Sequence, residues 1–416
     1  MKYCIIFLII LIQITFAKNI ERADIIVAKD GSGDFSTIQE ALNSIPENND
    51  TLKIILIKNG LYNEQIRIDK NFVALVGENR DSTRIEFYKP FDIYQAQKFD
   101  SSYQDFGRGI INIYANDVTL ANLTGENTQT DVNIHAFVVY GQDNTRTIII
   151  NCNMLSNGGD TVSLWNGENG MYYHNSCYFK GAVDFLCPRG WCYAENIDFY
   201  CTRTTTPLWH DGSKNQDQKF VVKNATFDGA TNFRLGRNHL DGAFYLINNT
   251  YSEKLNDRPF FRPESSKQPY KWGRRVYFYN CNREGGNYSW HENNLNEAPG
   301  DPDPEDINAL WTFAGQWDPE AHMPAVLPFT FLPKPYNKKN NIALDPLLTW
   351  VAARNARSYN IYFGKSKSPE FRLNTKGTRY QPERLDLNTT YYWRVDAVNG
   401  DQVIKGETWQ FHTIEE

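Results

Sequence analysis

The chain has 416 residues, of which 41% are hydrophobic, 14% aromatic and 22% charged, and its formal net charge is −6 at neutral pH. This length exceeds the needs of a single small domain, and the composition is that of a folded protein. Because the chain is acidic overall and has no basic stripe, we do not expect it to bind nucleic acid.

The N-terminal residues have the pattern of an export signal. Lys2 precedes an apolar run from Cys4 to Ile12, and the small residue Ala17 precedes a polar stretch. We expect a signal peptide over residues 1–17, cleaved after Ala17, and a secreted or periplasmic protein. The apolar run is too short for a stable span, so no membrane span is expected.

Six cysteines follow the expected cleavage site. Export permits disulfides, but the sequence does not determine their pairing. Cys187 and Cys192 are expected either to line the interior or to pair with each other. No cysteine or histidine cluster has zinc-site spacing, so we expect no metal and no cofactor. The six are Cys152, Cys177, Cys187, Cys192, Cys201 and Cys281.

Residues 27–46, VAKDGSGDFSTIQEALNSIP, predict a strand, a glycine-rich turn and one helix. Ser36 with Gln39 fits a capping box at the start of this helix. Three apolar residues at helical spacing, Ile38, Leu42 and Ile45, give the helix a buried face. We expect no comparably clear long helix after it.

A series of short apolar strands follows, and an asparagine recurs at the strand ends at intervals of 21 to 32 residues. Such a period predicts a solenoid. Because no helices separate the strands, we expect an all-β fold, a right-handed parallel β-helix whose asparagines hydrogen-bond from coil to coil. A large antiparallel sandwich would explain the short strands but not the recurrence of Asn122, Asn151, Asn175, Asn196, Asn224, Asn248 and Asn280.

The last part of the chain has a different character. Residues 331–341 are rich in proline and asparagine and are expected to form a linker after a β-helix domain over 18–330. Residues 342–416 alternate like the strands of a small β-sandwich. Leu385, Thr389 and Tyr391 have the spacing of a tyrosine corner, and Trp350 is the expected core tryptophan. This segment resembles a fibronectin type III domain.

Asp184 lies between Val183 and Phe185, where the neighbouring residues suggest a buried strand. A buried carboxylate is costly unless it is paired. Asp184 follows Asn175 by nine residues, and Asp160 follows Asn151 by nine. The two aspartates are therefore expected at equivalent points of adjacent coils, about 4.8 Å apart.

Two carboxylates at this separation cannot both ionise cheaply, which favours one ionised group and one protonated acid. Arg234 and Arg237, in the stretch NFRLGRNHL, lie about two coils further on and offer a bidentate partner for one carboxylate. The alternative is that both aspartates belong to structural ion pairs or turn caps.

From about Ile25 to Pro328, the chain resembles the pectin methylesterases. The opening VAKDGSGDFSTIQEAL is similar to the family's first segment. GDTVSLW resembles the motif of the family acid and assigns it to Asp160. GAVDF resembles the motif of the nucleophile and assigns it to Asp184. LGR resembles the motif of the arginine that holds the nucleophile and assigns it to Arg237.

The resemblance implies a two-step hydrolysis of methyl galacturonate esters in pectin, without a metal. Asp184 would attack the ester carbonyl, and Asp160 would protonate the departing methanol and then activate water. The expected partner is pectin, or methylated homogalacturonan, and the protein is expected to be a monomer. Other activities on the same fold stay open, namely a pectin lyase or hydrolase, and a pectin-binding protein without catalysis.

The chain departs from the family in the region that binds the oxyanion. The family glutamine before the acid is Gly159 here, and a second family glutamine falls near Asn133. His239 replaces a family tryptophan. The alternative for His135, His239 and the tryptophans is a purely structural role, in which they pack against neighbouring residues or cover the outer wall of the β-helix. Candidates for oxyanion and substrate contacts are Asn133, His135, Gly159, Trp165, Phe185, Trp191, His239 and Trp272.

Overall fold

A computed structural model describes residues 23–98, 100, 102, 104–210, 212–238, 241–263, 266, 269–291 and 293–415. The expected signal peptide and His239 lie outside the described residues. No helix in this described part combines the length and the apolar character needed to cross a membrane.

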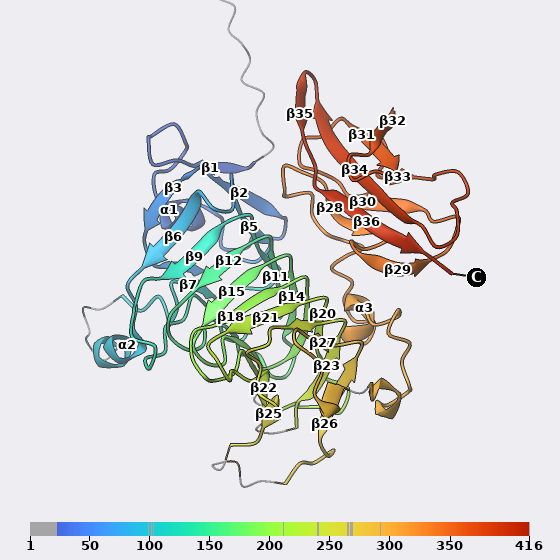
Figure 1. Ribbon diagram of the computed structural model, residues 1–416. Coiled ribbons are helices and arrows are strands. Elements are labelled where there is room, and N and C mark those ends of the chain that lie inside the picture. Colours follow the sequence, from blue (N-terminus) through green and yellow to red (C-terminus); the bar gives the residue numbers. More distant parts are fainter. Residues whose placement is uncertain are drawn as a thin grey trace, which may run out of the picture.

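Within the described residues, three parallel sheets wind into a β-helix (Figure 1). The ten-stranded sheet consists of β1 (Ile25–Val27), β2 (Lys53–Ile57), β5 (Val73–Gly77), β8 (Val118–Ala121), β11 (Arg146–Ile150), β14 (Met171–Asn175), β17 (Trp191–Glu195), β20 (Phe220–Lys223), β23 (Ala243–Ile247) and β26 (Arg275–Tyr279).

The other two sheets complete each coil. The eight-stranded sheet consists of β4 (Ile66–Ile68), β7 (Ile111–Ile113), β10 (Val139–Gly141), β13 (Val162–Leu164), β16 (Leu186–Pro188), β19 (Leu208–His210), β22 (Gly236–Asn238) and β25 (Phe260–Phe261). The nine-stranded sheet consists of β3 (Gly60–Asn63), β6 (Thr83–Phe87), β9 (Thr124–Asn127), β12 (Asn153–Leu155), β15 (Tyr178–Gly181), β18 (Asp198–Cys201), β21 (Thr226–Gly229), β24 (Thr250–Tyr251) and β27 (Asn282–Arg283).

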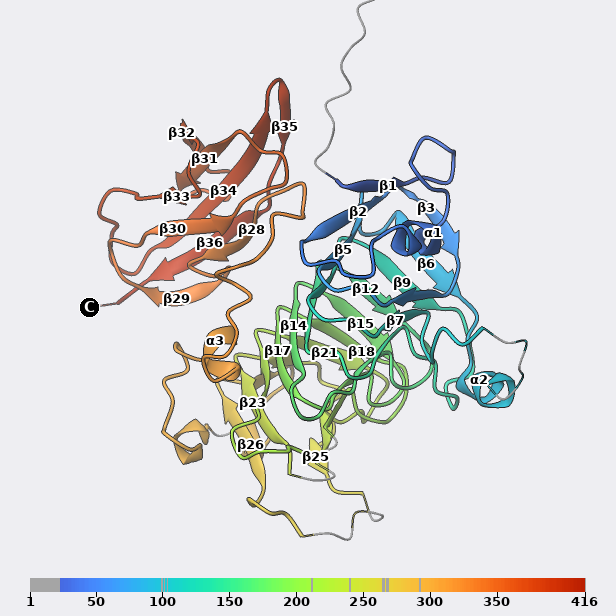
Figure 2. The same ribbon diagram turned by 180° about the vertical axis from the view of Figure 1, so that it is seen from behind.

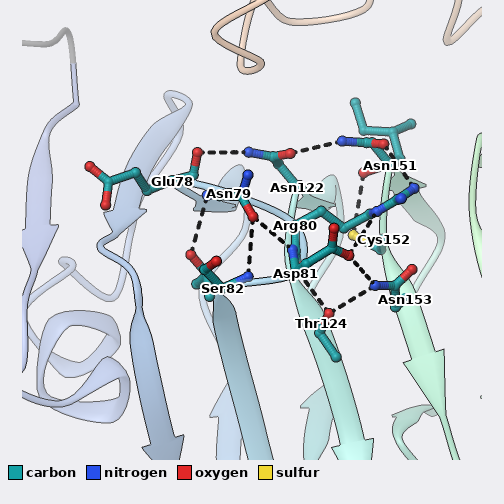
Figure 3. A network of polar contacts seen from close by, with 12 residues as sticks. Glu78, Asn79, Arg80, Asp81, Ser82, Asn122, Thr124, Asn151, Cys152 and Asn153 are labelled. Atoms are coloured by element: carbon teal, nitrogen blue, oxygen red, sulfur yellow. Dashed lines mark hydrogen bonds and ion pairs between the residues drawn. The ribbon is translucent and has the colours of Figure 1, made fainter.

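The recurring asparagines mark the turn from the ten-stranded to the nine-stranded sheet. Asn122 and Asn151 have φ values of 57° and 50°, a left-handed conformation that asparagine tolerates better than most residues. The amide of Asn151 donates to Asn122 Oδ1 over 2.8 Å, and that of Asn122 donates to the Gly77 carbonyl over 2.8 Å. Figure 3 shows this ladder, in which Asn153 also binds Asp81, two coils earlier.

One asparagine of the predicted series is displaced by one residue. Asn175 is the last residue of β14 and pairs in register with Ile150, so Ser176 is the equivalent of Asn151. Ser176 has the left-handed conformation, with φ of 55°. The Asn175 side chain still joins the ladder, because Asn196 donates to its Oδ1 over 3.2 Å.

The interior of the β-helix is filled by stacked apolar side chains, since every second residue of a strand points inward. The rings of Phe199 and Phe227 stack with centroids 4.5 Å apart. The six described cysteines are free thiols, so Cys187 and Cys192 do not pair. Cys192 lies in the interior as expected, but the expectation was wrong for Cys187, which pairs in register with Ser163 on the outer face of the eight-stranded sheet.

The described helices are short. The first, α1 (Ile38–Asn43), is capped by Thr37, whose side chain accepts from the Glu40 N–H. The predicted cap of Ser36 with Gln39 was therefore wrong by one residue, whereas Ile38, Leu42 and Ile45 are buried as expected. The others are α2 (Phe91–Gln97), α3 (Ala309–Thr312), and the 3₁₀ helices η1 (Ser289–His291) and η2 (Leu295–Glu297).

The C-terminal part is a β-sandwich, which confirms the predicted architecture. One sheet has three strands: β28 (Phe331–Lys334), β30 (Leu348–Val351) and β33 (Arg379–Tyr380). The other has β29 (Lys339–Ile342), β31 (Ser358–Gly364), β32 (Glu370–Thr375), β34 (Thr390–Asn399), β35 (Gln402–Ile404) and β36 (Thr408–Thr413).

The segment 331–341 was expected to be a linker, but it supplies β28 and most of β29. Phe331 and Leu332 are buried, and this apolar pair, rather than the prolines around it, decides its structure. The hydroxyl of Tyr391 accepts from the Asp386 N–H over 3.0 Å, as a tyrosine corner requires. Trp350 lies in the sandwich core beside the fully buried Trp393.

The sandwich lies beside the ten-stranded sheet in both views, and α2 lies on the opposite side of the molecule (Figures 1 and 2). The contact includes a buried polar cluster. Tyr336 donates to Glu320 over 2.7 Å, and Glu195 accepts from Tyr193 over 3.1 Å and from Asn224 over 2.8 Å. Burial raises the pKa of Glu195 to about 7, and repulsion from Glu320 adds to this effect.

Candidate active site

Asp184 lies just before β16 and is 4% exposed. Its backbone has a φ of 51°, and its N–H donates to the Thr206 carbonyl over 2.7 Å. Arg237 Nε donates to Asp184 Oδ1 over 2.9 Å, and a second guanidinium nitrogen pairs with Oδ2. The Thr206 hydroxyl donates to Oδ1 over 3.2 Å. The carboxylate is thus satisfied on both oxygens and held as an anion.

Arg237 comes from β22, two coils after Asp184, which matches the expected spacing. Its guanidinium also lies over the Trp209 ring, 4.3 Å from the centroid. Burial lowers the pKa of Arg237, while the Asp160 charge acts in the opposite direction. Arg234, the other arginine considered, lies over Phe261 instead.

Asp160 occupies the equivalent place one coil earlier. It precedes β13 by two residues, as Asp184 precedes β16, and Val162 pairs in register with Leu186. The Asp160 N–H donates to the Val183 carbonyl over 2.9 Å. The side chain of Asp160 is 13% exposed, against 5% for Asp184, so the two carboxyl groups differ in their access to solvent.

His135 contacts Asp160 directly, with 2.8 Å between Nδ1 and Oδ2. The hydrogen bond to Asp160 raises the pKa of His135, against the opposing effects of burial and of Arg237. His135 also pairs with Gly159 across a parallel bridge. Two of the candidates near the acid, His135 and Gly159, are therefore brought together with it.

An aromatic and basic surface lies beside the two aspartates on the eight-stranded sheet. The Trp165 ring packs edge-on against Tyr140, with centroids 5.2 Å apart, and against Phe137 at 5.8 Å. The guanidinium of Arg189 lies 3.8 Å from the Trp165 ring centroid and that of Arg108 at 5.0 Å. Trp165 is half-buried, so the exposed part of its side chain can stack on a sugar.

The register of the eight-stranded sheet shows which residues share the face of Arg237. Along each strand, the residues of this face alternate with residues that point into the interior, such as Val139, Val162 and Leu186. It carries Arg67, Asn112, Tyr140, Ser163, Cys187, Trp209, Arg237 and Phe261. Trp209 and Arg237 are direct neighbours in this row.

Two candidate substrate contacts were wrong. Phe185 is fully buried in the β-helix interior, where its ring lies 6.1 Å from that of Phe199. Asp184 takes the left-handed conformation, and the next residue turns inward. Trp191 lies on β17 of the ten-stranded sheet, buried against the cluster that meets the sandwich. The eight-stranded sheet, which carries Arg237, is a different face.

The remaining candidates are less closely connected to the aspartates. The Asn133 amide donates to Asp131 Oδ1 over 2.9 Å, an interaction within its own turn. Trp272 lies before β26, where its N–H donates to Asp241 and its ring is covered by Arg275. Its role stays a prediction.

Sequence reasoning missed several residues of this site. Thr206 and Trp209 lie ten and thirteen residues after Asn196 on the same coil, but nothing in their local sequence suggested contact with Asp184 or Arg237. Arg108 and Tyr140 come from earlier coils. The sequence signal for these two residues would have been the inward–outward alternation in the strands GIINIYA and AFVVYG, with the outward residues of the two strands taken as neighbours in one row.

The arrangement provides an anionic carboxylate next to a second carboxyl group that shares a hydrogen bond with an imidazole. The first can act as a nucleophile, and the second can donate and accept a proton. In the described part of the chain, no group of three or more His, Cys, Asp or Glu side chains could hold a metal ion.

Comparison with known proteins agrees with this fold. A family model described as Pectinesterase matches residues 24–246. The chain is 32% identical over 190 residues to Probable pectinesterase 56 of Arabidopsis thaliana, covering 44% of this chain and 58% of that protein. It is 26% identical over 180 residues to Pectinesterase 31 of the same organism, covering 42% and 55%. The chain thus spans a little over half the length of these two relatives.

Solved structures are similar over a larger share. Pectin methylesterase from carrot has a TM-score of 0.57 at 19% identity and covers 73% of this chain and 97% of that chain. Pectin methylesterase PemA from Erwinia chrysanthemi has a TM-score of 0.58 at 19% identity, with 71% and 98% covered. A pectin methylesterase in complex with a hexasaccharide has a TM-score of 0.55 at 18% identity, covering 71% and 98%. At these identities the likeness concerns the fold.

Proposed function

The chain belongs to the pectinesterase family, and we propose that it hydrolyses methyl esters of galacturonate in pectin, releasing methanol and pectate. The observation that carries this proposal is the pairing of Asp184 with Arg237 beside Asp160. Arg237 holds Asp184 ionised, while the second carboxyl group, with its imidazole partner, can hold a proton.

In the proposed first step, an Asp184 carboxylate oxygen attacks the ester carbonyl carbon. The carbonyl electron pair moves to oxygen and returns as the C–O bond to methoxide breaks, and methoxide takes a proton from the Asp160 side. Methanol leaves, and Asp184 is joined to the galacturonate carboxyl as an anhydride. Since Asp184 enters as an anion, its contact with Arg237 must loosen as its charge disappears.

In the second step, Asp160 acts as a base. It removes a proton from water as the water oxygen attacks the galacturonate carbonyl of the anhydride. The bond to Asp184 breaks with its electron pair on Asp184, which restores the ion pair with Arg237. The galacturonic acid product then loses its proton to solvent, and the proton on the Asp160 side is restored for the next cycle.

The surface around Trp165 supports a polymeric, anionic substrate. Arg108 and Arg189 both place positive charge against the Trp165 ring, and galacturonate offers both a carboxylate and a sugar face. A structurally similar pectin methylesterase binds a hexasaccharide. We therefore propose that methylated homogalacturonan lies across the eight-stranded sheet. We further propose a monomer that is exported after cleavage behind Ala17.

The test is methanol release from highly methylated pectin by the chain from Lys18 onward, without added metal. Wild type should release methanol, and Asp184→Asn should lose at least about 10³-fold of the rate because the amide cannot form the anhydride. Asp228→Asn, on the nine-stranded sheet, is the matched control. Release that survives in Asp184→Asn, or absence of release from folded wild type, would reject the proposal. An unsaturated sugar product would instead indicate a lyase.

A further inference from the structure

The contact between His135 and Asp160 contains one proton that the ester mechanism has not yet used. A carboxylate only accepts hydrogen bonds, so the 2.8 Å contact requires a proton on either Nδ1 or Oδ2. Asp160 is largely buried, whereas the imidazole is 45% exposed. The pair therefore connects the buried carboxyl group to solvent through the histidine ring.

The backbone fixes His135 in this position. His135 and Gly159 are bridge partners on consecutive coils, and the Ala136 N–H donates to the Gly159 carbonyl over 3.0 Å. The His135 carbonyl accepts from the Phe91 N–H over 3.0 Å. The imidazole ring packs against the rings of Phe91 and Phe137, each with its centroid 6.2 Å away, and these two rings also contact each other.

Gly159 supplies the space that the pair needs. A Cβ atom at position 159 would lie 2.9 Å from His135 Nδ1 and 2.8 Å from Val183 Cγ1. Both separations are shorter than real side chains tolerate, so any larger residue would displace the imidazole. The absence of a side chain at 159 and the presence of histidine at 135 belong together.

The other polar groups in this corner are already engaged. The Gly158 N–H donates to Ser156 Oγ over 2.9 Å, and the Gly159 N–H donates to the Ile134 carbonyl over 3.4 Å. The Asn133 amide is bound to Asp131. Among the donors considered for this region within the described residues, the imidazole is the one directed at the Asp160 carboxyl group.

The charged groups that face His135 act in opposite directions. Asp160 favours the imidazolium form, and Arg237, from β22, disfavours it. Asp184 is neutralised locally by Arg237, so it adds little to this balance. The outcome is a pKa of His135 above its ordinary value, with the hydrogen bond to Asp160 as the main cause.

We propose that Asp160 and His135 together hold the proton that the departing methoxide takes, with His135 as a positioning residue acting through Asp160. One proton leaves the pair: it moves from an Asp160 oxygen to the methoxide oxygen as the carbon–oxygen bond breaks, which leaves Asp160 as a carboxylate that accepts the Nδ1–H of neutral His135. Water later returns one proton to the pair. This inference rests on the proposed ester hydrolysis and deepens it.

The pair should keep the proton donor protonated up to neutral pH. A lone carboxyl group loses its proton as the pH rises past the carboxyl range, whereas the pair keeps one proton until the imidazolium titrates. His135→Gln should keep the hydrogen bond to Asp160 but not the titrating proton. We expect kcat within about threefold of wild type near pH 5, and at least about tenfold lower near pH 7.5, with KM little changed.

Two further variants define what this loss means. His412→Gln, in the C-terminal sandwich, removes a hydrogen-bonded imidazole away from the pair and should leave the whole pH profile unchanged. Gly159→Ala should displace His135 and reproduce the selective loss near pH 7.5. A loss in His135→Gln that is equal at every pH, or no loss at all, would overturn the proposal.

A second readout does not depend on activity. NMR titration of the His135 imidazole, assigned by its disappearance in His135→Gln, should give a lower pKa in Asp160→Asn than in wild type. An unchanged pKa would overturn the pair even if methanol is released. If wild type releases no methanol but the pKa does fall, the pair exists and the proposed ester hydrolysis is what fails.

Discussion

The backbone N–H of Asp160 donates to the carbonyl of Val183, the residue before Asp184, over 2.9 Å, so the two aspartates are stacked on consecutive coils. Their partners differ. Asp184 accepts two contacts from Arg237, and Asp160 shares a hydrogen bond with His135. A permanent cation therefore lies beside one carboxyl group and an imidazole beside the other, so the two groups have different electrostatic partners at the same fold position.

Replacing Arg237 by lysine should lower kcat by about 100-fold, because a single ammonium cannot bind both oxygens of Asp184. The matched control is Arg234→Lys, three residues earlier, whose guanidinium lies over Phe261 instead. Methanol release at saturating pectin measures both variants. Equal losses in the two would mean that the bidentate contact has no special role.

Phe185→Leu should reduce stability and leave pectin binding alone. The ring is fully buried in the β-helix interior, so the smaller side chain should cost about 1–2 kcal/mol of unfolding free energy. The urea midpoint should fall while KM for pectin stays at the wild-type value. A raised KM with an unchanged midpoint would place the ring in the substrate groove after all.

Trp165→Ala and Arg189→Ala should each raise KM for pectin by roughly tenfold, because each removes half of a cation–π pair on the proposed binding surface. The effect of Arg189→Ala should shrink as salt is added, since the interaction is with an anionic polymer. Lys180→Ala, on the nine-stranded sheet, serves as the charge-matched control and should leave KM unchanged.

The pH dependence of stability should report on Glu195. Its pKa is raised from 4.5 to about 7, so the folded state binds this proton more tightly than the unfolded state. Stability should therefore fall as the pH rises from about 4.5 to 7, by on the order of 3 kcal/mol.

Glu195→Gln should remove that dependence and raise the urea midpoint near pH 8, with little effect near pH 5. Glu407→Gln, an exposed control, should change neither. A variant that is less stable than wild type near pH 8 would show instead that the ionised Glu195 stabilises the cluster beside the sandwich.

The repeating pattern of the sequence was enough to predict the β-helix. An apolar strand ending in asparagine recurs because each coil needs a residue that tolerates a left-handed turn, and this requirement is local. The C-terminal sandwich was predictable for a similar reason, since strand alternation and the Tyr391 spacing are local features. Asp160, Asp184 and Arg237 could be placed on one site because coils stack in a fixed order.

The residue count that aligned the aspartates succeeded through two compensating differences. Asn175 lies one residue before Ser176, which is the true equivalent of Asn151. The stretch from β15 to β16 is also one residue shorter than the matching stretch from β12 to β13. Both intervals therefore came to nine residues. The pattern alone could not reveal this, because strand ends are set by pairing with the adjacent coil.

Only the tertiary structure decided which side chains face the site. A shift of one residue along a strand turns a side chain from the surface to the interior, and this put Phe185 in the core. Trp191 lies on another sheet, and Thr206 and Trp209 come from the coil that follows Asn196, where no motif indicated them. The sequence by itself determined the coil and the charges that it carries. The pairing of His135 with Asp160 required the stacking of coils, because contact between residues 25 apart depends on which face each one occupies and on the space left by Gly159.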